Sequence, residues 1–497
     1  MDIIDIKNEI KNSNNIFDVY INIYHAIDKC EIKIIRAVVD RNEEKYVSYS
    51  LNIYARFISD DFNITISETN KSILIKFIEA STTESDFYLR TYVLFKEIDK
   101  VFGDKDILNS KCNKNIGMGG LSLTGKKTEK IKPLNSNKTY NKGYVYHFNH
   151  DNVLNYNEHK YRTQSKVNAS IEGTIKNIFV YKSEDRKDYN IVLSSLTSQH
   201  FNKKLKKYEN NLKIAIVPFI NGQDYLILDK EKEKQGFYVN GVNFENEYKE
   251  KLLTIIKELN EKEVNIVVFP EMVMTKLMID ELKKFLKENK NSFLIIAAGT
   301  VWENGVNYCK LIIGDGNEII KQEKCNPFHS QNGWEKLGTI ELLNLDKRII
   351  NIIDIPNFGR CGVAICVDYI TEHYQKILKD MNTGIIFSPT YTPSIERFED
   401  FSKNFTSYNT ATLMSNACCM RNLAAKKNDD NNLEEISVSF VEIPGLKRET
   451  FIKCKECSDS CIKNYTAACY FIINLPYKDV NSNNSYCNIK KKMIKYG

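Results

Sequence analysis

From Asn211 onward, short apolar runs alternate with longer segments of helical periodicity. The apolar runs include "LKIAIVPFI", "VNIVVFPEMV", "SFLIIAAGTVW", "IINIIDIP" and "TGIIFSPTY". Segments such as "EYKEKLLTIIKELNEK" and "DELKKFLKE" lie between them. This alternation predicts a layered α/β domain over residues 211–497. Because nearly every position of each run is apolar, we expect both faces of the sheets to be covered.

Residues 1–108 carry a different pattern, in which large apolar side chains recur three and four positions apart. This spacing predicts a mainly helical or α+β N-terminal domain whose apolar stripes form its core. The stripes are Tyr20, Ile23, Tyr24 and Ile27, followed by Tyr88, Tyr92, Phe95 and Phe102.

Between these two parts lie a polar stretch and a short region of recovered apolar alternation. Residues 109–142 are rich in Gly, Lys and Asn, which predicts a linker or long loop. Residues 143–210 contain "GTIKNIFVYK" and "YNIVLSSL" and predict a small mixed, basic subdomain. Residues 111–210 hold 19 Lys and Arg against 8 Asp and Glu, whereas the whole chain has a net charge of +6. This surplus of basic residues is typical of a solvated connector. The alternative is that the segment binds nucleic acid or another polyanion.

Length and composition restrict the class of protein. A chain of 497 residues is too long for one ordinary core, so two domains are expected. Neither the start, "MDIIDIKNEI", nor the longest apolar runs suit a secretory signal or a membrane span, which favours a cytoplasmic protein without a membrane partner. The 13 cysteines are an odd number, and we interpret them as reduced thiols.

Three residues at the ends of apolar runs carry candidate chemistry. Glu271 follows "VNIVVFP", Lys324 lies eight residues after the "GDG" turn, and Cys366 follows "GVAI". Each alone has an ordinary explanation: a surface carboxylate, a solvated lysine and a packed cysteine. Their common context gives them more weight.

That context resembles the nitrilase superfamily, the carbon-nitrogen hydrolases. The family pattern is an opening strand "IA-V", a "VFPE" with the first acid, an "N-----G-DG" turn leading to a lysine, and a "GV-IC-D" with the nucleophile. The resemblance spans about residues 211–478. The matching positions are Ile214 to Val217, Phe269 to Glu271, Asn307 with Gly314 to Gly316, Lys324, and Gly362 to Asp368.

The resemblance implies a four-layer α-β-β-α sandwich, a homo-oligomer and roles for the three residues. Cys366 would be the nucleophile, at a turn where a helix N-terminus favours the thiolate. Glu271 would be the general acid and base, with a pKa raised by burial. Lys324 would stabilise the anionic tetrahedral state, helped by the backbone N–H of Val367. No cofactor is implied.

Two positions depart from the family pattern. Many members carry a second glutamate about eight residues after the lysine, where this chain has Asn332, with Glu335 three positions later. We favour Asn332 as the orienting group because "NGW", which includes Trp334, resembles the family's "EGW". Val367 replaces an aromatic residue that often follows the nucleophile, so we expect a pocket of different shape.

Other motifs carry less weight, and we expect no metal or nucleotide site. "GLSLTGK" lacks the Ser or Thr that follows the lysine of a phosphate-binding loop. His147, His150 and His159 fit no compact zinc spacing. "CKECSDSC" lacks a second C-x-x-C pair. Cys418 and Cys419 lie in an apolar, strand-like run and are expected in the core.

The resemblance therefore implies an amidase-like enzyme that cleaves a non-peptide C–N bond of a small amide or nitrile through a cysteine thioester. The N-terminal region would regulate it. One alternative is a nitrilase-like binding or effector protein that no longer turns over. The other is a stress or antiviral defence enzyme that a polyanion or partner switches on.

Overall fold

The computed structural model describes most of the chain and divides it into two compact units. The smaller unit comprises residues 1–125, 131–149 and 159–187, and the larger unit comprises residues 126–130, 150–158 and 188–497. The described residues are 3–39, 43–58, 65–101, 127–136, 142–147, 152–156, 178–181, 188–208, 211–220, 222–231, 236–329, 340–420, 437–446, 451–453, 468–475 and 488–494.

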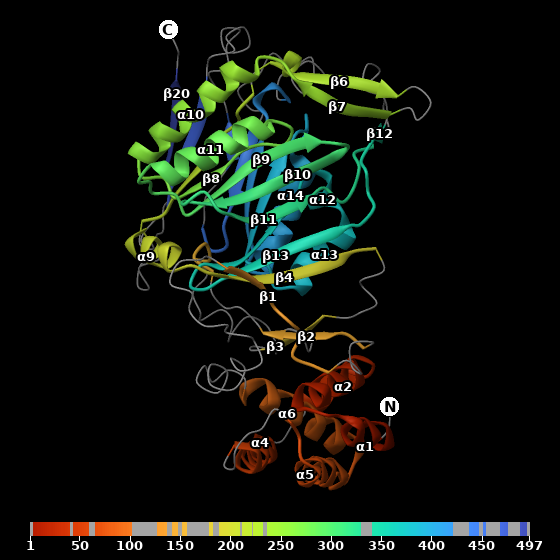
Figure 1. Cartoon of the computed structure of the whole chain (residues 1–497). Coiled ribbons are helices and arrows are strands. Elements are labelled where there is room, and N and C mark those ends of the chain that lie inside the picture. The colour runs from red at the N-terminus through yellow and green to blue at the C-terminus, as the bar shows by residue number, and fades with distance from the viewer. Residues whose placement is uncertain are drawn as a thin grey trace. The chain divides into compact units, whose positions relative to one another are not determined.

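The smaller unit is helical, with a short antiparallel strand pair added to it (Figure 1). Its stripe residues are buried as predicted, including Tyr20, Ile23, Tyr88 and Phe95, whereas Phe102 lies outside the described residues. The elements are α1 (Ile3–Asn12), α2 (Ile16–Asp28), α3 (Glu31–Val39), α4 (Glu43–Ile58), α5 (Glu68–Glu79), α6 (Glu84–Val101), β2 (Tyr144–His147) and β3 (Ile178–Tyr181).

Two large sheets form the centre of the larger unit. One has eight strands, in the order β1 (Lys127–Lys130), β4 (Asn190–Thr197), β13 (Ile349–Ile355), β14 (Gly359–Val363), β15 (Ile385–Thr390), β16 (Ala411–Asn416), β17 (Ser437–Glu442) and β18 (Phe451–Lys453). The other has seven, in the order β11 (Glu318–Glu323), β10 (Val306–Ile313), β9 (Ile295–Glu303), β8 (Ile266–Val268), β5 (Lys213–Ile216), β19 (Ala468–Asn474) and β20 (Asn488–Ile494).

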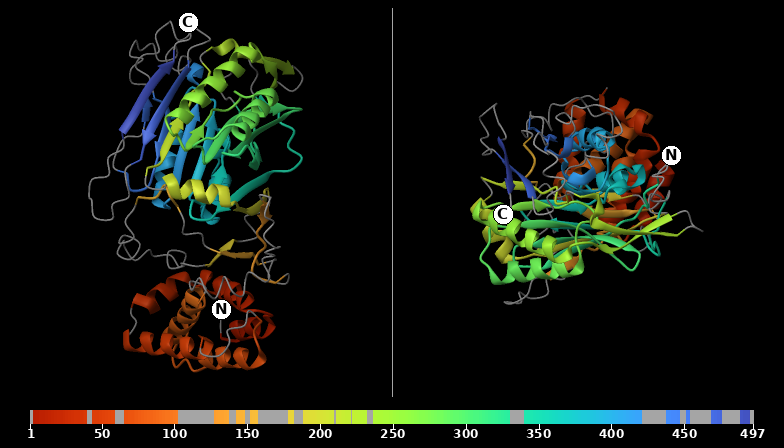
Figure 2. Two further views of the ribbon diagram at one scale, coloured as in Figure 1. Left: turned by 60° about the vertical axis from the view of Figure 1, so that its left-hand side comes forward. Right: turned by 90° about the horizontal axis from the view of Figure 1, so that it is seen from above.

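The two sheets face each other, and helices cover their outer sides (Figures 1 and 2). Strands β15 and β16 of one sheet contact β8, β9 and β5 of the other. Helices α10 (Glu245–Glu261) and α11 (Lys276–Glu288) pack on the seven-stranded sheet, and α12 (Val367–Ile370), α13 (Glu372–Asp380) and α14 (Glu396–Ser407) belong to the eight-stranded side. The predicted α-β-β-α sandwich is therefore confirmed, and so is the helical N-terminal region.

Burial on both faces explains why β8 and the first half of β9 are continuous apolar runs. All residues of β15 and β16 are buried, and the two strands pair in parallel. Helix α11 instead buries one stripe, which includes Met278, Leu282 and Leu286, and Thr275 caps its first turn by accepting a hydrogen bond from the Met278 N–H. These are the two periodicities that the sequence shows.

The structure divides the region predicted as a separate subdomain, residues 143–210. Strands β2 and β3 pack with the smaller unit, where Val145, Ile178 and Val180 join the helical core. Strand β4 instead pairs in parallel with β13, and α9 (Gln199–Tyr208) follows it in the larger unit. The continuous part of the larger unit thus begins at Asp188 and not at the predicted Asn211, because β4 finds its hydrogen-bond partner in the eight-stranded sheet.

A third, small sheet contributes directly to the site described below. The antiparallel hairpin of β6 (Leu226–Glu231) and β7 (Gly236–Val242) follows η3 (Gln223–Tyr225), and β7 also pairs in parallel with β12 (Ile340–Glu341). Gly236 allows this pairing, since a Cβ atom there would lie 2.5 Å from the Leu342 side chain.

Candidate active site

The three predicted residues lie at the ends of strands from both large sheets. Glu271 follows β8 and Lys324 follows β11 in the seven-stranded sheet, whereas Cys366 follows β14 in the eight-stranded sheet. The backbone also joins the sheets here, because the Glu271 N–H donates to the Thr390 carbonyl at 3.3 Å. The fold therefore brings together residues that are nearly a hundred positions apart in the chain.

A tight turn fixes the position of Glu271. The next residue, Met272, has a positive φ of 59°, and its N–H donates to Thr300 Oγ1 at 2.7 Å. Gly299, with a φ of 69°, lies against this turn, and a Cβ atom there would be 2.5 Å from the Pro270 carbonyl oxygen. The turn therefore needs glycine at position 299, both for space and for backbone conformation.

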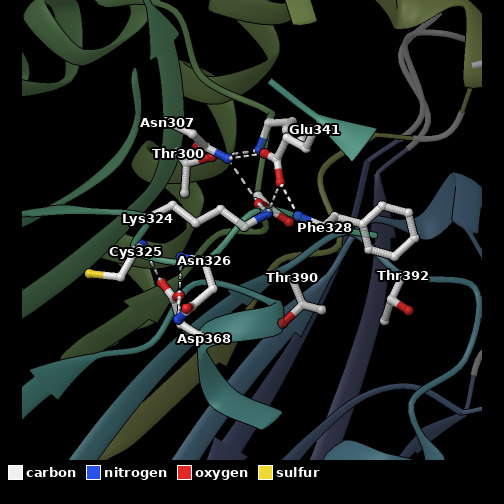
Figure 3. Close-up of polar contacts among 12 residues, drawn as sticks. Thr300, Asn307, Lys324, Cys325, Asn326, Phe328, Glu341, Asp368, Thr390 and Thr392 are labelled. Carbon is white, nitrogen blue, oxygen red and sulfur yellow. Dashed lines mark hydrogen bonds and ion pairs between the residues drawn. The ribbon is translucent and has the colours of Figure 1, made fainter. Parts of the chain in front are cut away.

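Lys324 lies between two buried carboxylates (Figure 3). Its Nζ is 2.7 Å from Glu271 Oε1 and 2.6 Å from Glu341 Oε2, and these side chains are at most 1% exposed. Asn307 closes a ring, because its Nδ2 donates to Glu271 Oε1 at 2.9 Å and to Glu341 Oε1 at 3.4 Å. Two carboxylates thus share one ammonium group in a dry environment, which keeps the lysine charged.

Glu341 is a member of this ring that no sequence pattern predicted. It lies 17 positions after Lys324, on a two-residue strand held by the β6–β7 hairpin. Besides Lys324 and Asn307, its carboxylate accepts from the Phe328 N–H at 2.9 Å. No local motif marks it, because its place depends on strand pairing with a distant hairpin. Asn332, Trp334 and Glu335, at the position expected for the second acid, lie outside the described residues.

Cys366 occupies a strained turn beside Glu271. Its φ and ψ are 47° and −109°, outside the main allowed regions for a non-glycine residue, and its N–H donates to the Pro389 carbonyl at 2.9 Å. The N–H groups of Cys366 and Glu271 donate to adjacent carbonyls of β15, those of Pro389 and Thr390, so the two residues are neighbours, and the charges of Glu271 and Lys324 act on the thiol. Val367 is the first residue of the adjoining helix α12. The side chain of Cys366 is buried, with 4% of the residue exposed.

The electrostatics of the thiol differ from the expectation of a helix-stabilised thiolate. Helix α12 has only four residues, so few peptide dipoles align behind Cys366. Burial raises the pKa of the Cys366 thiol well above its ordinary value, Glu271 adds to this rise, and Lys324 opposes it. The thiol is therefore protonated at rest and needs a base to become a nucleophile.

The two charged partners have pKa shifts of distinct origin. Burial raises the pKa of Glu271, and the neighbouring Glu341 raises it further, against the attraction of Lys324. Burial alone would lower the pKa of Lys324, but Glu271 and Glu341 outweigh burial and hold it well above its ordinary value. A base with a raised pKa beside a permanently charged ammonium suits proton transfer near a developing anion.

The described residues also contain a cavity of about 330 Å³ next to the Glu271 turn. Met272 and Met274 line it from that turn, Val301 and Trp302 from β9, and Val239 from β7. Trp302 pairs with Asn307 across the β9–β10 ladder, so the two side chains share one face of the sheet. The cavity is thus a neighbour of the carboxylate ring, although Cys366 is not among its lining residues.

The remaining motifs lie mostly outside the described residues. This holds for the glycine-rich residues 120–126, for His150 and His159, and for the Cys-rich residues 454–461. Within the described part of the chain, no group of three or more His, Cys, Asp or Glu could hold a metal ion. Cys418 and Cys419 are buried, as expected of core residues. No helix of the described residues is long and apolar enough to cross a membrane.

Several solved structures are similar to this chain. Nit3 of Saccharomyces cerevisiae, a member of branch 10 of the nitrilase superfamily, is 15% identical with a TM-score of 0.30, over 49% of this chain and 85% of that one. The C. elegans NitFhit protein is 14% identical with a TM-score of 0.31, over 42% and 51%. A mutant amidase from Nesterenkonia sp. AN1, with the acetamide moiety of fluoroacetamide on its active-site cysteine, is 9% identical with a TM-score of 0.28, over 41% and 75%.

Neither a family model nor a curated protein sequence matches the chain. Nit3 belongs to the family that the sequence motifs resemble. At these identities and TM-scores, the similar structures carry no argument about the chemistry of this chain.

Proposed function

We propose that the larger unit is a carbon-nitrogen hydrolase that cleaves the C–N bond of a non-peptide amide through a thioester on Cys366. The observation that carries the proposal is that Cys366 and Glu271 bind the adjacent carbonyls of Pro389 and Thr390, and that Glu271 is itself bound to a buried lysine. A nucleophile, a base and a fixed positive charge within one contact shell are the parts that acyl transfer requires.

The contacts of Glu271 indicate which of its oxygens moves the proton. Lys324 and Asn307 both donate to Oε1, which leaves Oε2 for the thiol. In the first step Oε2 takes the proton of Cys366, and the sulfur attacks the carbonyl carbon of the amide. The carbonyl π electrons move to the oxygen, which becomes the anion of a tetrahedral intermediate.

Lys324 would stabilise this anion. An ammonium group has three N–H donors, and Glu271 and Glu341 accept two of them. The third would face the substrate oxygen, together with the backbone N–H of Val367. Stabilisation of this kind is worth about 3 to 4 kcal/mol in other acyl-transfer sites. Glu341 accepts from Lys324, Asn307 and Phe328, so it would orient the lysine and take no part in proton transfer.

The intermediate collapses when Glu271 returns its proton to the leaving nitrogen. The C–N bond breaks, the amine departs, and the acyl group stays on sulfur as a thioester. Glu271 then takes a proton from water, the hydroxide oxygen attacks the thioester, and the C–S bond breaks. The acid product leaves, and the thiolate recovers its proton from Glu271. Every proton in this cycle is carried by Glu271, and no cofactor is needed.

The test is mass spectrometry of the intact protein after incubation with a panel of small amides and nitriles. We expect an acyl adduct on Cys366 and release of the amine. The Cys366→Ala variant should lose both adduct and turnover. Cys418→Ala is the matched control, because Cys418 is equally buried, and it should keep both. Turnover retained by Cys366→Ala would refute the proposal.

A second candidate is a binding or effector protein with this fold that does not turn over. The observation that favours it is the burial of Cys366, of which 4% is exposed. A thiol-reactive probe separates the candidates. An active site should label Cys366 much faster than Cys418, whereas equal, slow labelling of both would favour the binding protein.

Regulation by the N-terminal unit and assembly into a homo-oligomer are further parts of the proposal. The motive for the first is the basic surplus of residues 111–210. Turnover measured with and without a nucleic acid, at low and high salt, tests it, because activation by a polyanion should weaken as salt rises. The motive for the second is the family resemblance, and sedimentation of the full chain tests it.

A further inference from the structure

Asp368 binds the chain segment that follows Lys324 (Figure 3). One carboxylate oxygen, Oδ2, accepts from the Cys325 N–H at 3.0 Å. The other, Oδ1, accepts from the Asn326 N–H at 2.8 Å and from Asn326 Nδ2 at 2.7 Å. Asp368 is fully buried. Three donors on one buried carboxylate make a strong and directional attachment.

This attachment joins the two sheets at the candidate site. Cys325 and Asn326 directly follow Lys324 at the end of β11, in the seven-stranded sheet. Asp368 lies two residues after Cys366, beyond β14 of the eight-stranded sheet. The carboxylate therefore connects the backbone beside the lysine to the backbone beside the thiol, although it touches neither reacting group.

Tyr189 fixes the orientation of the third donor, the side-chain amide of Asn326. Its hydroxyl donates to Asn326 Oδ1 at 3.0 Å, which assigns the amide orientation and turns Nδ2 toward Asp368. The hydrogen bonds from Cys325 and Asn326 also explain why position 368 holds an aspartate. An Asn at position 368 would present an N–H to one of these N–H donors, and a Glu would need an additional methylene group in a space without exposed surface.

We infer that Asp368 is a positioning residue, which holds the Lys324 ammonium at the correct distance from Cys366 by binding the two residues after the lysine. The inference rests on the proposed function for its effect on turnover. Its effect on the reactivity of the thiol does not depend on turnover.

Several charged and titratable groups surround Asp368 and bear on its pH behaviour. Burial raises the pKa of Asp368 to about 7, against hydrogen bonds from Cys325 and Asn326 and the charge of Lys324. The attachment therefore has its full set of acceptors above about pH 7, where the carboxylate is ionised. The neighbouring groups are Lys324 and Cys325 after β11, Tyr189 before β4, Arg348 before β13 and Tyr374 on α13.

The experiment compares Asp368→Asn with Asp354→Asn in the full chain. Asp354 forms an ion pair with the buried Arg360 at 2.6 Å. It lies near the end of β13 that pairs with the start of β14, whereas Cys366 lies beyond the other end of β14. This control measures the cost of losing a carboxylate that binds a buried charge away from the site. Both variants are compared in three measurements. These are thermal unfolding, the kcat and KM for the amide that is turned over fastest, and the labelling of Cys366 by iodoacetamide as a function of pH.

We expect Asp368→Asn to lower kcat by about 100-fold, the effect of a displacement of about 1 Å, with little change in KM. Labelling of Cys366 should shift to higher pH, because Lys324 lowers the thiol pKa and would move away. Removal of a nearby negative charge alone would shift labelling to lower pH. The sign of the shift thus separates positioning from direct electrostatics.

Asp354→Asn should unfold at a lower temperature but keep the labelling profile of the wild type. If Asp368→Asn does not fold, Asn326→Ala replaces it; that variant removes one of the three donors and should shift labelling in the same direction by a smaller amount. A folded Asp368→Asn with unchanged labelling, or with a shift to lower pH, would overturn the inference. Absence of turnover in the wild type would refute the proposed function. The labelling of Cys366 would then still decide whether Asp368 positions Lys324.

Discussion

A buried carboxylate in each unit has several polar partners, and the pKa values of these two carboxylates shift in opposite directions. In the smaller unit, Asp86 accepts from Tyr49 Oη at 2.6 Å, from the Thr82 N–H at 3.1 Å and from Arg90 Nε at 3.1 Å. Burial acts to raise the pKa of Asp86, but these donors outweigh burial and lower it. In the larger unit, the pKa of Glu271 is raised.

Burial acts to raise the pKa of both carboxylates, and the donors and charges around each one decide whether burial prevails. Asp86 alone receives three donors, one of them a guanidinium, whereas Glu271 shares its two donors, the ammonium of Lys324 and the amide of Asn307, with Glu341. A carboxylate with ample donors is a structural anion, because it gives up its charge only at low pH. A carboxylate with few donors and a like charge nearby can accept a proton near neutral pH, which a general base must do.

The largest expected effect comes from removing the shared cation. Lys324→Met leaves Glu271 and Glu341 facing each other in a buried site, and loss of one partner of a buried ion pair costs about 3 to 5 kcal/mol. Turnover should be abolished. Chemical denaturation of wild type and variant measures the first effect, and amide turnover the second. A variant as stable as the wild type would show that the ring is not a net source of stability.

Glu271→Gln tests the base directly. The amide keeps the shape of the side chain and can still accept from Lys324, so the unfolding temperature should change little. Turnover should fall by about 10²- to 10⁴-fold, the usual contribution of a general acid and base. Steady-state kinetics measure the loss. Unchanged turnover would remove Glu271 from the mechanism and, with it, the contrast to Asp86.

Asp86→Asn tests the structural cluster. It weakens three hydrogen bonds, two of which involve a neutral donor, so we expect a loss of about 1 to 3 kcal/mol in unfolding free energy and no change in kcat. Because the folded pKa of Asp86 is depressed, its stabilisation is present above the unfolded pKa and is lost as the pH falls through the folded pKa. Denaturation of wild type and variant at pH 7 and near pH 3 should show the difference shrinking at the lower pH.

Glu341→Gln should produce the smallest change, a shift of the pH profile. Glu341 raises the pKa of Glu271 through its like charge. Its neutralisation should lower that pKa, and the acid limb of kcat/KM should move to lower pH, because Glu271 must be ionised to accept the thiol proton. The profile of kcat/KM against pH measures the shift. A limb displaced to higher pH would contradict the assigned interaction.

Much of the larger unit follows from the sequence because its strands are buried on both faces. Continuous apolar runs such as β8 and the first half of β9 predict covered strands, and the positions of Glu271, Lys324 and Cys366 after strands predict a site at strand ends. The stripes of α2 and α6 likewise predict a helical core. In each case the relevant signal lies within a few residues along the chain.

Partner choice between strands was not predictable in the same way. The boundary at Asn211 differs from the division of the structure because β4 pairs with β13, more than 150 positions away. Glu341 was missed because β12 is two residues long and is placed by β7. Backbone hydrogen bonds make these pairings, and they leave no mark on the identity of the paired residues.

The sequence by itself determined the layered α/β class, the helical N-terminal region and the candidate residues Glu271, Lys324 and Cys366, because periodicity and residue chemistry are local properties. Only the tertiary structure decided that Glu341 and Asn307 share the site, that Asp368 joins the two sheets beside it, and that the pKa of Glu271 is raised while that of Asp86 is lowered. These properties depend on how many donors and charges surround a group in space, and residues far apart in the chain supply them.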